Sequence, residues 1–308
     1  MSYGCHVAKV SHILPNPNKN RKTMLDAIKK DTDMMLGCVQ IFTQGPRNSR
    51  MSPMNYEAIS EYCKSKKIRL YVHSSYITVG IFSINHENKN TEKSKNAISG
   101  LLKQFEACDK LNSKGLVIHL AKKNTDEIIN TLFVIIPLIK KFKTPIVFEQ
   151  PAKKPDDLKT YETPEKINNL TIMIMEKFPK FTNWYWCIDT CHLWSAGIEL
   201  NDKNVIEEWI REIKYPAKIG LFHINGGSYE IFNTGKDKHI IPFSEEDDIW
   251  KNIFDKKNIK KNKYKNSSLY PIIKFCKDNN IDSILEINRG SYDDINFTFH
   301  VLDMVFNN

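Results

Sequence analysis

Short runs of β-branched and aromatic residues recur along the chain and are separated by longer segments with helical spacing. Runs of this length and composition predict strands. The eight predicted strands are Tyr3 to Val10, Cys38 to Phe42, Ile68 to Val72, Leu116 to Leu120, Ile146 to Glu149, Trp184 to Ile188, Ile219 to Ile224 and Ser283 to Ile287. Strands that alternate with helices in this way are typical of a parallel sheet covered by helices.

The segments between the strands carry helix start signals and apolar stripes. A capping residue precedes a proline at Ser52-Pro53 and at Thr163-Pro164, so each pair predicts the start of a helix. The predicted stripes are Ile59 and Cys63; Ile167, Leu170 and Ile174; and, in a third helix, Ile98, Leu101, Leu102, Phe105 and Cys108. Since no low-complexity linker interrupts them, the strands and helices predict a single (β/α)8 barrel domain over residues 1–308.

The chain has a formal net charge of +9, mostly from lysine. Such a surplus suits a polyanionic partner, because neutralised phosphates release condensed counterions. An AT-rich genome, whether bacterial, protist or viral, explains the abundant lysine equally well. Seven cysteines inside apolar segments predict buried free thiols and a reducing, intracellular compartment. The start resembles no secretory signal and the longest apolar run is too short to span a bilayer, so we expect a soluble protein.

One stretch breaks the alternation, because Asn225 to about Ser267 carries no predicted strand. Loops of this length inside compact domains are usually functional or disordered. The segment Lys251 to Lys265 holds seven lysines and makes up most of a Lys-rich insertion at about residues 251–266. Two interpretations stay open: a solvated surface insertion and an arm that contacts nucleic acid.

Ionisable residues end most of the predicted strands. In a (β/α)8 barrel these ends lie together on the C-terminal rim, where active sites form. The strand-end residues are His73, His119, Glu149, Asp189, His223 and Glu286, and His192, Asp237 and His239 follow beyond strand ends or in the long loop. Imidazole and carboxylate without thiolate favour Zn²⁺, with Mn²⁺ as second choice, at a hydrolytic site. Nine ligands suffice for more than one ion, and a bridging carboxylate is then expected.

Other histidines and cysteines carry weaker signals. A lone histidine at a strand end is more often a satisfied polar residue than a ligand, so the metal prediction rests on recurrence at successive strand ends. His6 ends the first strand and is a candidate for a supporting role. The histidines without such a context are His12, His86 and His300. Cys187 and Cys191 flank Asp189 without C-x-x-C spacing, which favours structural thiols.

The candidate ligands lie in motifs that follow one another along nearly the whole chain. These are Gly4-Cys5-His6-Val7, Gln40-Ile41-Phe42-Thr43, Val72-His73-Ser74-Ser75-Tyr76, Val117-Ile118-His119, Phe148-Glu149, Cys187-Ile188-Asp189-Thr190-Cys191-His192, Leu221-Phe222-His223-Ile224-Asn225, Asp237-Lys238-His239 and Leu285-Glu286. In this order they resemble the endonuclease IV family of apurinic/apyrimidinic (AP) endonucleases. The Asp-Thr-Cys-His and Asp-x-His elements are the specific ones.

The resemblance implies a xylose-isomerase-like (β/α)8 barrel with three zinc ions. By position, the three ligand sets would be His73, His119 and Glu149; Glu149, Asp189, His223 and Glu286; and His192, Asp237 and His239. Glu149 would be the bridging ligand, and Glu149 and Glu286 the catalytic carboxylates. The implied activity is hydrolysis of the phosphodiester 5′ to an abasic site in double-stranded DNA during base excision repair. It leaves a 3′-hydroxyl and a 5′-deoxyribose phosphate, and we expect the enzyme to act as a monomer.

The resemblance also implies that Arg47, Tyr76 and Ile77 insert into the duplex, which is easiest where no base remains to be unpaired. The chain departs from the family after His239, where a short Gly-Glu-Gly segment is usual and this sequence has Ile240 to Glu246. The DNA contacts of that loop therefore stay open.

Three other functions are compatible with part of these features. Sugar isomerases of the xylose-isomerase type share the barrel and a two-ion rim, but they give no reason for Asp237 and His239 in the long loop or for a positive net charge. Ultraviolet-damage endonucleases share the metal layout, so the choice of lesion is less secure than the chemistry. A DNA-binding barrel without catalysis predicts the loss of some ligands, whereas all nine are present.

Overall fold

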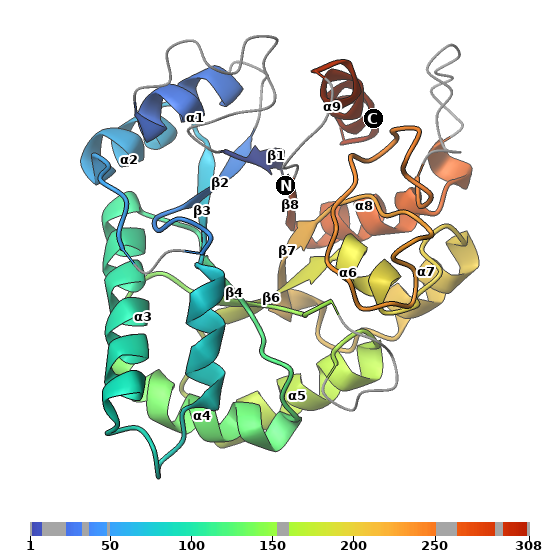
Figure 1. The fold of residues 1–308 in the computed structure, drawn as a ribbon. Helices are drawn as coiled ribbons and strands as arrows, with labels where there is room; N and C mark the ends of the chain where they lie inside the picture. The colour runs from blue at the N-terminus through green and yellow to red at the C-terminus, as the bar shows by residue number, and fades with distance from the viewer. Residues whose placement is uncertain are drawn as a thin grey trace.

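Eight parallel strands close into a barrel in sequence order, and β1 pairs with β8 to complete it (Figure 1). The computed structural model describes residues 2–7, 23–32, 37–47, 50–152, 160–250, 264–286 and 292–306. The strands are β1 Tyr3–His6, β2 Cys38–Phe42, β3 Arg69–His73, β4 Leu116–His119, β5 Ile146–Glu149, β6 Trp184–Asp189, β7 Ile219–His223 and β8 Asp282–Leu285. The predicted (β/α)8 fold is confirmed.

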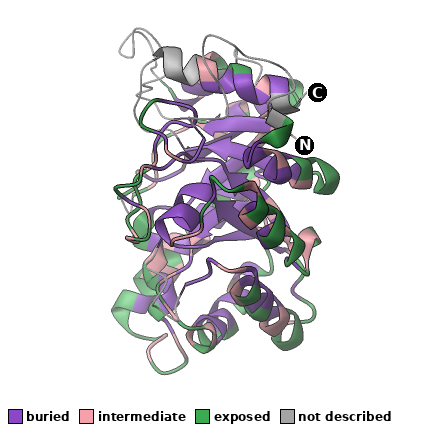
Figure 2. Cartoon of the chain, turned by 90° about the vertical axis from the view of Figure 1, so that its right-hand side faces the viewer, coloured by how far each residue is buried: buried purple, intermediate pink, exposed green. Residues whose placement is uncertain are grey.

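Helices follow most of the strands and cover the outside of the barrel, so that the strands are buried and the helices keep an exposed face (Figure 2). The α-helices are α1 Met24–Thr32, α2 Tyr56–Ser65, α3 Glu92–Leu111, α4 Thr125–Ile139, α5 Pro164–Lys177, α6 Thr190–Ser195, α7 Lys203–Arg211, α8 Leu269–Asn279 and α9 Tyr292–Phe306. The 3₁₀ helices are η1 Tyr76–Ser83, η2 Pro216–Lys218 and η3 Tyr264–Asn266. In the described part of the chain, no helix is both long and apolar enough to cross a membrane.

Side-chain caps set the helix starts. Thr163 caps α5 by accepting a hydrogen bond from the Lys166 amide, as predicted. The predicted start at Ser52-Pro53 is wrong, because α2 begins at Tyr56 and Asn55 caps it by accepting from Ala58. The Ser52 amide instead donates to the Thr43 carbonyl, which holds this residue in the preceding loop.

The strand predictions hold to within one residue at most ends. Two predicted strands run too far, because β1 ends at His6 and β8 ends at Leu285; the predicted ends, Val10 and Ile287, lie outside the described residues. Residues 251–263 of the predicted Lys-rich insertion also lie outside them. All seven cysteines are buried and free, which confirms the prediction of buried thiols without a disulfide framework.

The barrel interior contains a separate apolar layer. Its buried side chains come one each from β2 to β8: Cys38, Tyr71, Val117, Val147, Cys187, Leu221 and Ile284. Because side chains alternate along a strand, the residue two positions later points to the same interior. Those later residues are Gln40, His73, His119, Glu149, Asp189, His223 and Glu286. A polar layer therefore lies above the apolar one, at the C-terminal end of the barrel.

Candidate metal centre

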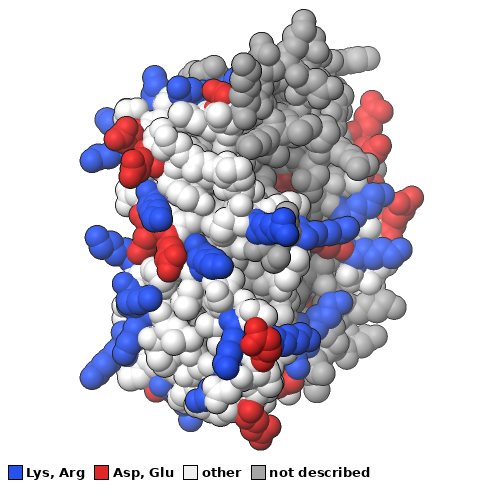
Figure 3. All heavy atoms as spheres, turned by 60° about the vertical axis from the view of Figure 1, so that its left-hand side comes forward, with Lys and Arg blue, Asp and Glu red and all other residues white. Residues whose placement is uncertain are grey.

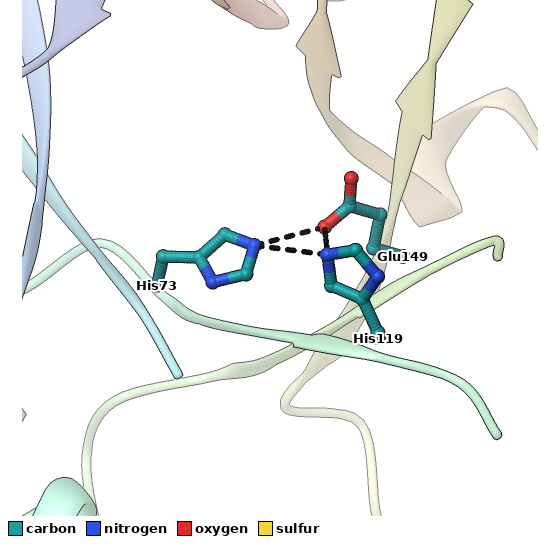
Figure 4. A group of neighbouring side chains, drawn as sticks. All are labelled: His73, His119 and Glu149. Atoms are coloured by element: carbon teal, nitrogen blue, oxygen red, sulfur yellow. Dashed lines mark hydrogen bonds and ion pairs between the residues drawn. The ribbon is translucent and has the colours of Figure 1, made fainter. Parts of the chain in front are cut away.

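Three side chains from β3, β4 and β5 converge on one point. His73 Nε2 lies 3.2 Å from Glu149 Oε2 and 3.2 Å from His119 Nε2, and His119 Nε2 lies 3.1 Å from Glu149 Oε2 (Figure 4). Ligands at about 2.0–2.1 Å from a tetrahedral Zn²⁺ lie about 3.3 Å from one another. The triangle therefore has the size that a shared zinc ion requires.

A second group adjoins the first and shares Glu149 with it. The ligand atoms of Glu149, Asp189, His223 and Glu286 all lie within 4.8 Å of one another. The Nδ1 of His223 is 3.0 Å from Glu149 Oε1, 3.6 Å from Asp189 Oδ2 and 3.5 Å from Glu286 Oε2. Oε2 of Glu149 faces the first group and Oε1 faces the second, which is the arrangement of a bridging carboxylate.

A third group lies nearer the solvent and combines α6 with the loop after β7. Asp237 Oδ1 lies 3.5 Å from His192 Nε2 and 3.0 Å from His239 Nε2. Both Nε2 atoms are buried and lack a well-aligned hydrogen bond among the described residues. Two buried imidazole lone pairs beside one carboxylate fit a cation at this position.

In three of the ligand histidines, the other ring nitrogen lies against a backbone carbonyl oxygen. The Nδ1 atoms of His73, His192 and His239 lie 2.8, 2.7 and 3.1 Å from the backbone carbonyl oxygens of Ser74, Gln150 and Glu286. A carbonyl only accepts, so each Nδ1 carries a proton, and in the neutral imidazole each Nε2 is a lone pair that can bind a cation. Metal-ligating histidines show this division of roles.

The metal-free groups balance buried charges of opposite sign. Burial opposes ionisation of Glu149, but the imidazoles of His119 and His223 outweigh it and hold the pKa of this carboxyl well below its usual range. Burial likewise opposes the charged form of His192 and His239, yet nearby carboxylates raise the pKa of both well above the usual value. Positive charge at these positions therefore stabilises the buried carboxylates, and a divalent cation would supply such a charge.

Amide side chains that the sequence-based prediction missed as site residues hold the ligands in place. Gln40 accepts from His223 Nε2 at 3.1 Å and donates to Glu286, while Asn225 donates to Asp189 Oδ2 at 2.6 Å. The main-chain amide of Glu286 donates to the side chain of Asn225 at 2.9 Å. Both amides could be found by the period-two rule, since Gln40 follows Cys38 and Asn225 follows His223 by two positions.

The other histidines and two of the cysteines lie in different surroundings. His6 lies 3.1 Å from Gln40 Nε2, next to the ligand groups as expected for a supporting residue. His86 and His300 are exposed and belong to none of the ligand groups found among the described residues, whereas His12 lies outside those residues. Burial raises the pKa of Cys187 and of Cys191, which favours the neutral thiols, although Cys187 lies within 4.8 Å of ligand atoms of Glu149 and His223 and Cys191 of those of Asp189 and His239.

The predicted DNA-contacting residues lie in the loop after β2, which carries Arg47, and at the start of η1, which carries Tyr76 and Ile77. Tyr76 and Ile77 are 37% and 54% exposed, and Arg47 is also exposed. The ring of Tyr76 stands edge-on to those of His119 and His73, at centroid distances of 5.3 and 5.8 Å. The Tyr76 amide donates to the Pro46 carbonyl at 2.9 Å, so Arg47, the next residue along the chain, lies close to the start of η1.

Comparisons with known proteins agree with this arrangement. A "Probable AP endonuclease" of African swine fever virus (isolate Pig/Kenya/KEN-50/1950) is 27% identical over 259 residues, covering 82% of this chain and 79% of that protein. A "Probable endonuclease 4" of Mycoplasmopsis pulmonis (strain UAB CTIP) is 26% identical over 234 residues, covering 72% and 78%.

Solved structures share the fold over the full length. The crystal structure of AsfvAP:AG gives a TM-score of 0.80 at 22% identity and covers 99% of this chain and 98% of that chain. Endonuclease IV from Thermus thermophilus gives 0.69 at 18% identity and covers 100% and 99%. A family model described as a xylose isomerase-like TIM barrel matches residues 36–267. The chain therefore belongs to the xylose isomerase-like TIM barrel family and, within it, to the endonuclease IV family of AP endonucleases.

Proposed function

We propose that this protein is a DNA repair endonuclease that uses three zinc ions to hydrolyse the phosphodiester 5′ to an abasic site. The observation that carries the proposal is the carboxylate of Glu149, which turns one oxygen to each of two adjoining ligand groups. The relatives named as AP endonuclease and endonuclease 4 support the same activity.

The zinc ions would be held by three sets of residues. These are His73, His119 and Glu149; Glu149, Asp189, His223 and Glu286; and His192, Asp237 and His239. Bound zinc supplies a Lewis acid and lowers the pKa of a bound water toward about 7. Glu149 and Glu286 would orient the attacking water, and the Gln40 amide, which donates to Glu286, would hold that carboxylate in place. Cleavage leaves a 3′-hydroxyl and a 5′-deoxyribose phosphate.

Recognition of the abasic duplex falls to side chains at the mouth of the barrel. Tyr76 and Ile77 would fill the space that the missing base leaves, and Arg47 would contact the backbone. The net charge of +9 favours association with DNA. Figure 3 shows Lys and Arg side chains spread over one face among acidic ones, so the attraction is diffuse on that face.

A sugar isomerase is the alternative from another enzyme class, since the barrel and two of the ligand groups suit both activities. The third group favours the nuclease. His192 from α6, with Asp237 and His239 from the loop after β7, adds a third cation position, for which a two-ion sugar site gives no reason. An ultraviolet-damage endonuclease shares this argument, so the lesion has to be decided by experiment.

The test is an incision assay on a panel of duplexes with zinc present. One duplex carries a single tetrahydrofuran abasic analogue, one carries a pyrimidine photoproduct with intact bases, and one is undamaged. We expect a single cut 5′ to the analogue and none in the other two. No incision at the analogue would refute the proposal, and cutting at the photoproduct would favour the alternative nuclease.

A further inference from the structure

The loop after β7 folds around one buried carboxylate, Asp247, which is 0% exposed. Its Oδ1 accepts hydrogen bonds from the amides of Gly227 and Ile249, at 3.2 and 3.0 Å. Its Oδ2 accepts from the amides of Phe243 and Trp250, at 2.8 and 3.2 Å. Each oxygen thus accepts two main-chain N–H groups from different parts of the loop.

Gly226 packs directly against Asp247, so no larger side chain fits at this position. A Cβ on Gly226 would lie 2.7 Å from Asp247 Cγ and 3.0 Å from the Ile240 carbonyl oxygen. Gly226 also exchanges two main-chain hydrogen bonds with Ile240, at 2.9 and 3.1 Å. The contact between Asp247 and Gly226, with the two main-chain hydrogen bonds of Gly226, therefore fixes the position of Ile240, the residue that directly follows His239.

The backbone of the same segment is strained, which indicates that contacts with surrounding residues hold its conformation. Phe243 has a φ of 66°, in the left-handed region that a bulky residue rarely adopts. Such a conformation persists where the surroundings impose it. The hydrogen bond from the Phe243 amide to Asp247 is one such constraint.

We propose that Asp247 is a positioning residue that holds the loop so that Asp237 and His239 meet His192. This inference rests on the proposed three-zinc function. Both oxygens of Asp247 are occupied by main-chain donors, and it belongs to none of the ligand groups found among the described residues, so it acts through the loop. The loop that follows His239 thus contains the support for the third metal position.

The experiment measures zinc content after dialysis against a weak chelator in wild type and in Asp247→Asn. The asparagine keeps one acceptor oxygen but turns an NH₂ group toward two main-chain donors. We expect wild type to keep three zinc ions and the variant to keep two, with affinity for the third lowered about 10- to 100-fold. Main-chain hydrogen exchange in the metal-free proteins should show lost protection at Gly227, Phe243, Ile249 and Trp250 in the variant alone.

A second variant and two controls separate positioning from general damage. Gly226→Ala places a methyl group against Asp247 and should also lose the third zinc, whereas Gly100→Ala in α3 has nothing within 4 Å of its Cβ and should keep all three. Asn168→Ala removes buried hydrogen bonds to residues 212 and 214 on the outside of the barrel, so it should lower the melting temperature without metal loss.

Three bound zinc ions in both Asp247→Asn and Gly226→Ala, or retained protection at the four amides, would overturn the role of Asp247 while leaving the proposed function intact. A wild-type protein that binds only two zinc ions would contradict the three-zinc site itself, and with it this role.

Discussion

Oε1 of Glu149 lies 3.0 Å from the Nδ1 of His223, while the other oxygen of the same carboxylate faces the imidazoles from β3 and β4. This relationship joins β5 to β7 across the interior of the barrel. It also makes the two ligand groups interdependent, because turning the carboxylate toward one group withdraws an oxygen from the other. Substitutions at Glu149 should therefore affect both groups at once.

Replacing Glu149 with glutamine should abolish incision. The amide keeps the size of the side chain but replaces one ligand oxygen with an NH₂ group that cannot bind a cation. We expect kcat/KM at an abasic analogue to fall by more than about 100-fold, since loss of an outer partner of a metal ligand alone lowers affinity or activity by about 10- to 100-fold. Duplex binding in a gel-shift assay should persist.

The control for Glu149→Gln is Glu106→Gln on α3, which changes the charge by the same amount at an exposed position on the outside of the barrel. It should leave incision within about twofold of wild type, because surface substitutions away from a site have small effects. A Glu149→Gln protein that still cuts at the wild-type rate would show that the bridging role is misassigned.

The sequence predicted the barrel well because its signal is local and repeated. Each strand from β2 to β8 carries an apolar interior residue two positions before a polar one, as in Val147 and Glu149 or Leu221 and His223. The start of α2 was predicted wrongly because Ser52-Pro53 and Asn55 are both acceptable start signals. Only the hydrogen bond from Ser52 to Thr43, a contact across the loop, decides between them.

The supporting residues of the site were harder to predict than the ligands. Gln40 lies in an apolar strand, where one amide gives no indication of the two partners it bridges. Asp247 belongs to the acidic run 245–248, in which Glu245 and Glu246 are exposed and Asp247 is fully buried. All of these residues are acidic, so the sequence does not show which of them is buried. Only the fold of the loop distinguishes Asp247 from its neighbours.

The metal-free protein should lose stability as the pH rises above neutrality. The pKa values of His192, His223 and His239 are raised, so their contribution is present below the unfolded value of about 6.5 and is lost as pH rises through the folded values. The lowered pKa of Glu149 gives a contribution that is present above about 4.3 and lost at lower pH. Maximum stability should lie between these limits.

Zinc should reverse this pH dependence, because its ligands must be deprotonated to bind. Thermal melts of chelator-treated protein from about pH 6 to about pH 9 should therefore show a falling melting temperature. The increase on adding zinc should grow over the same range. An identical pH profile with and without zinc would contradict this account of the ligand groups.

Arg47 and Ile77 should affect DNA binding in different ways. Arg47→Ala removes a charge that neutralises phosphate, so the slope of log affinity against log salt should become shallower by about 1. Ile77→Ala removes apolar contact area without a charge, so it should weaken binding to an abasic duplex and leave the slope unchanged. The measurement is a salt titration of the dissociation constant for both variants. Equal slopes in wild type and Arg47→Ala would exclude a phosphate contact.

Gln40 should be needed for zinc affinity because the oxygen and the nitrogen of its side-chain amide contact two different ligands. Its oxygen accepts from His223 Nε2, which leaves Nδ1 as the lone pair that faces the carboxylates, and its nitrogen donates to Glu286. Gln40→Glu keeps the acceptor but places a second carboxylate against Glu286 in a fully buried position. Zinc affinity measured by chelator competition should fall by about 10- to 100-fold.

The matched control for Gln40→Glu is Gln104→Glu, because Gln104 is also fully buried and its amide donates to Thr78 Oγ1 at 2.9 Å rather than to a ligand. Both variants bury a new acid, so both should lower the melting temperature. Only Gln40→Glu should lower zinc affinity, since only there does the new charge face a ligand carboxylate. If Gln104→Glu weakened zinc binding equally, the effect of Gln40 would have to be assigned to stability of the barrel rather than to the orientation of His223 and Glu286.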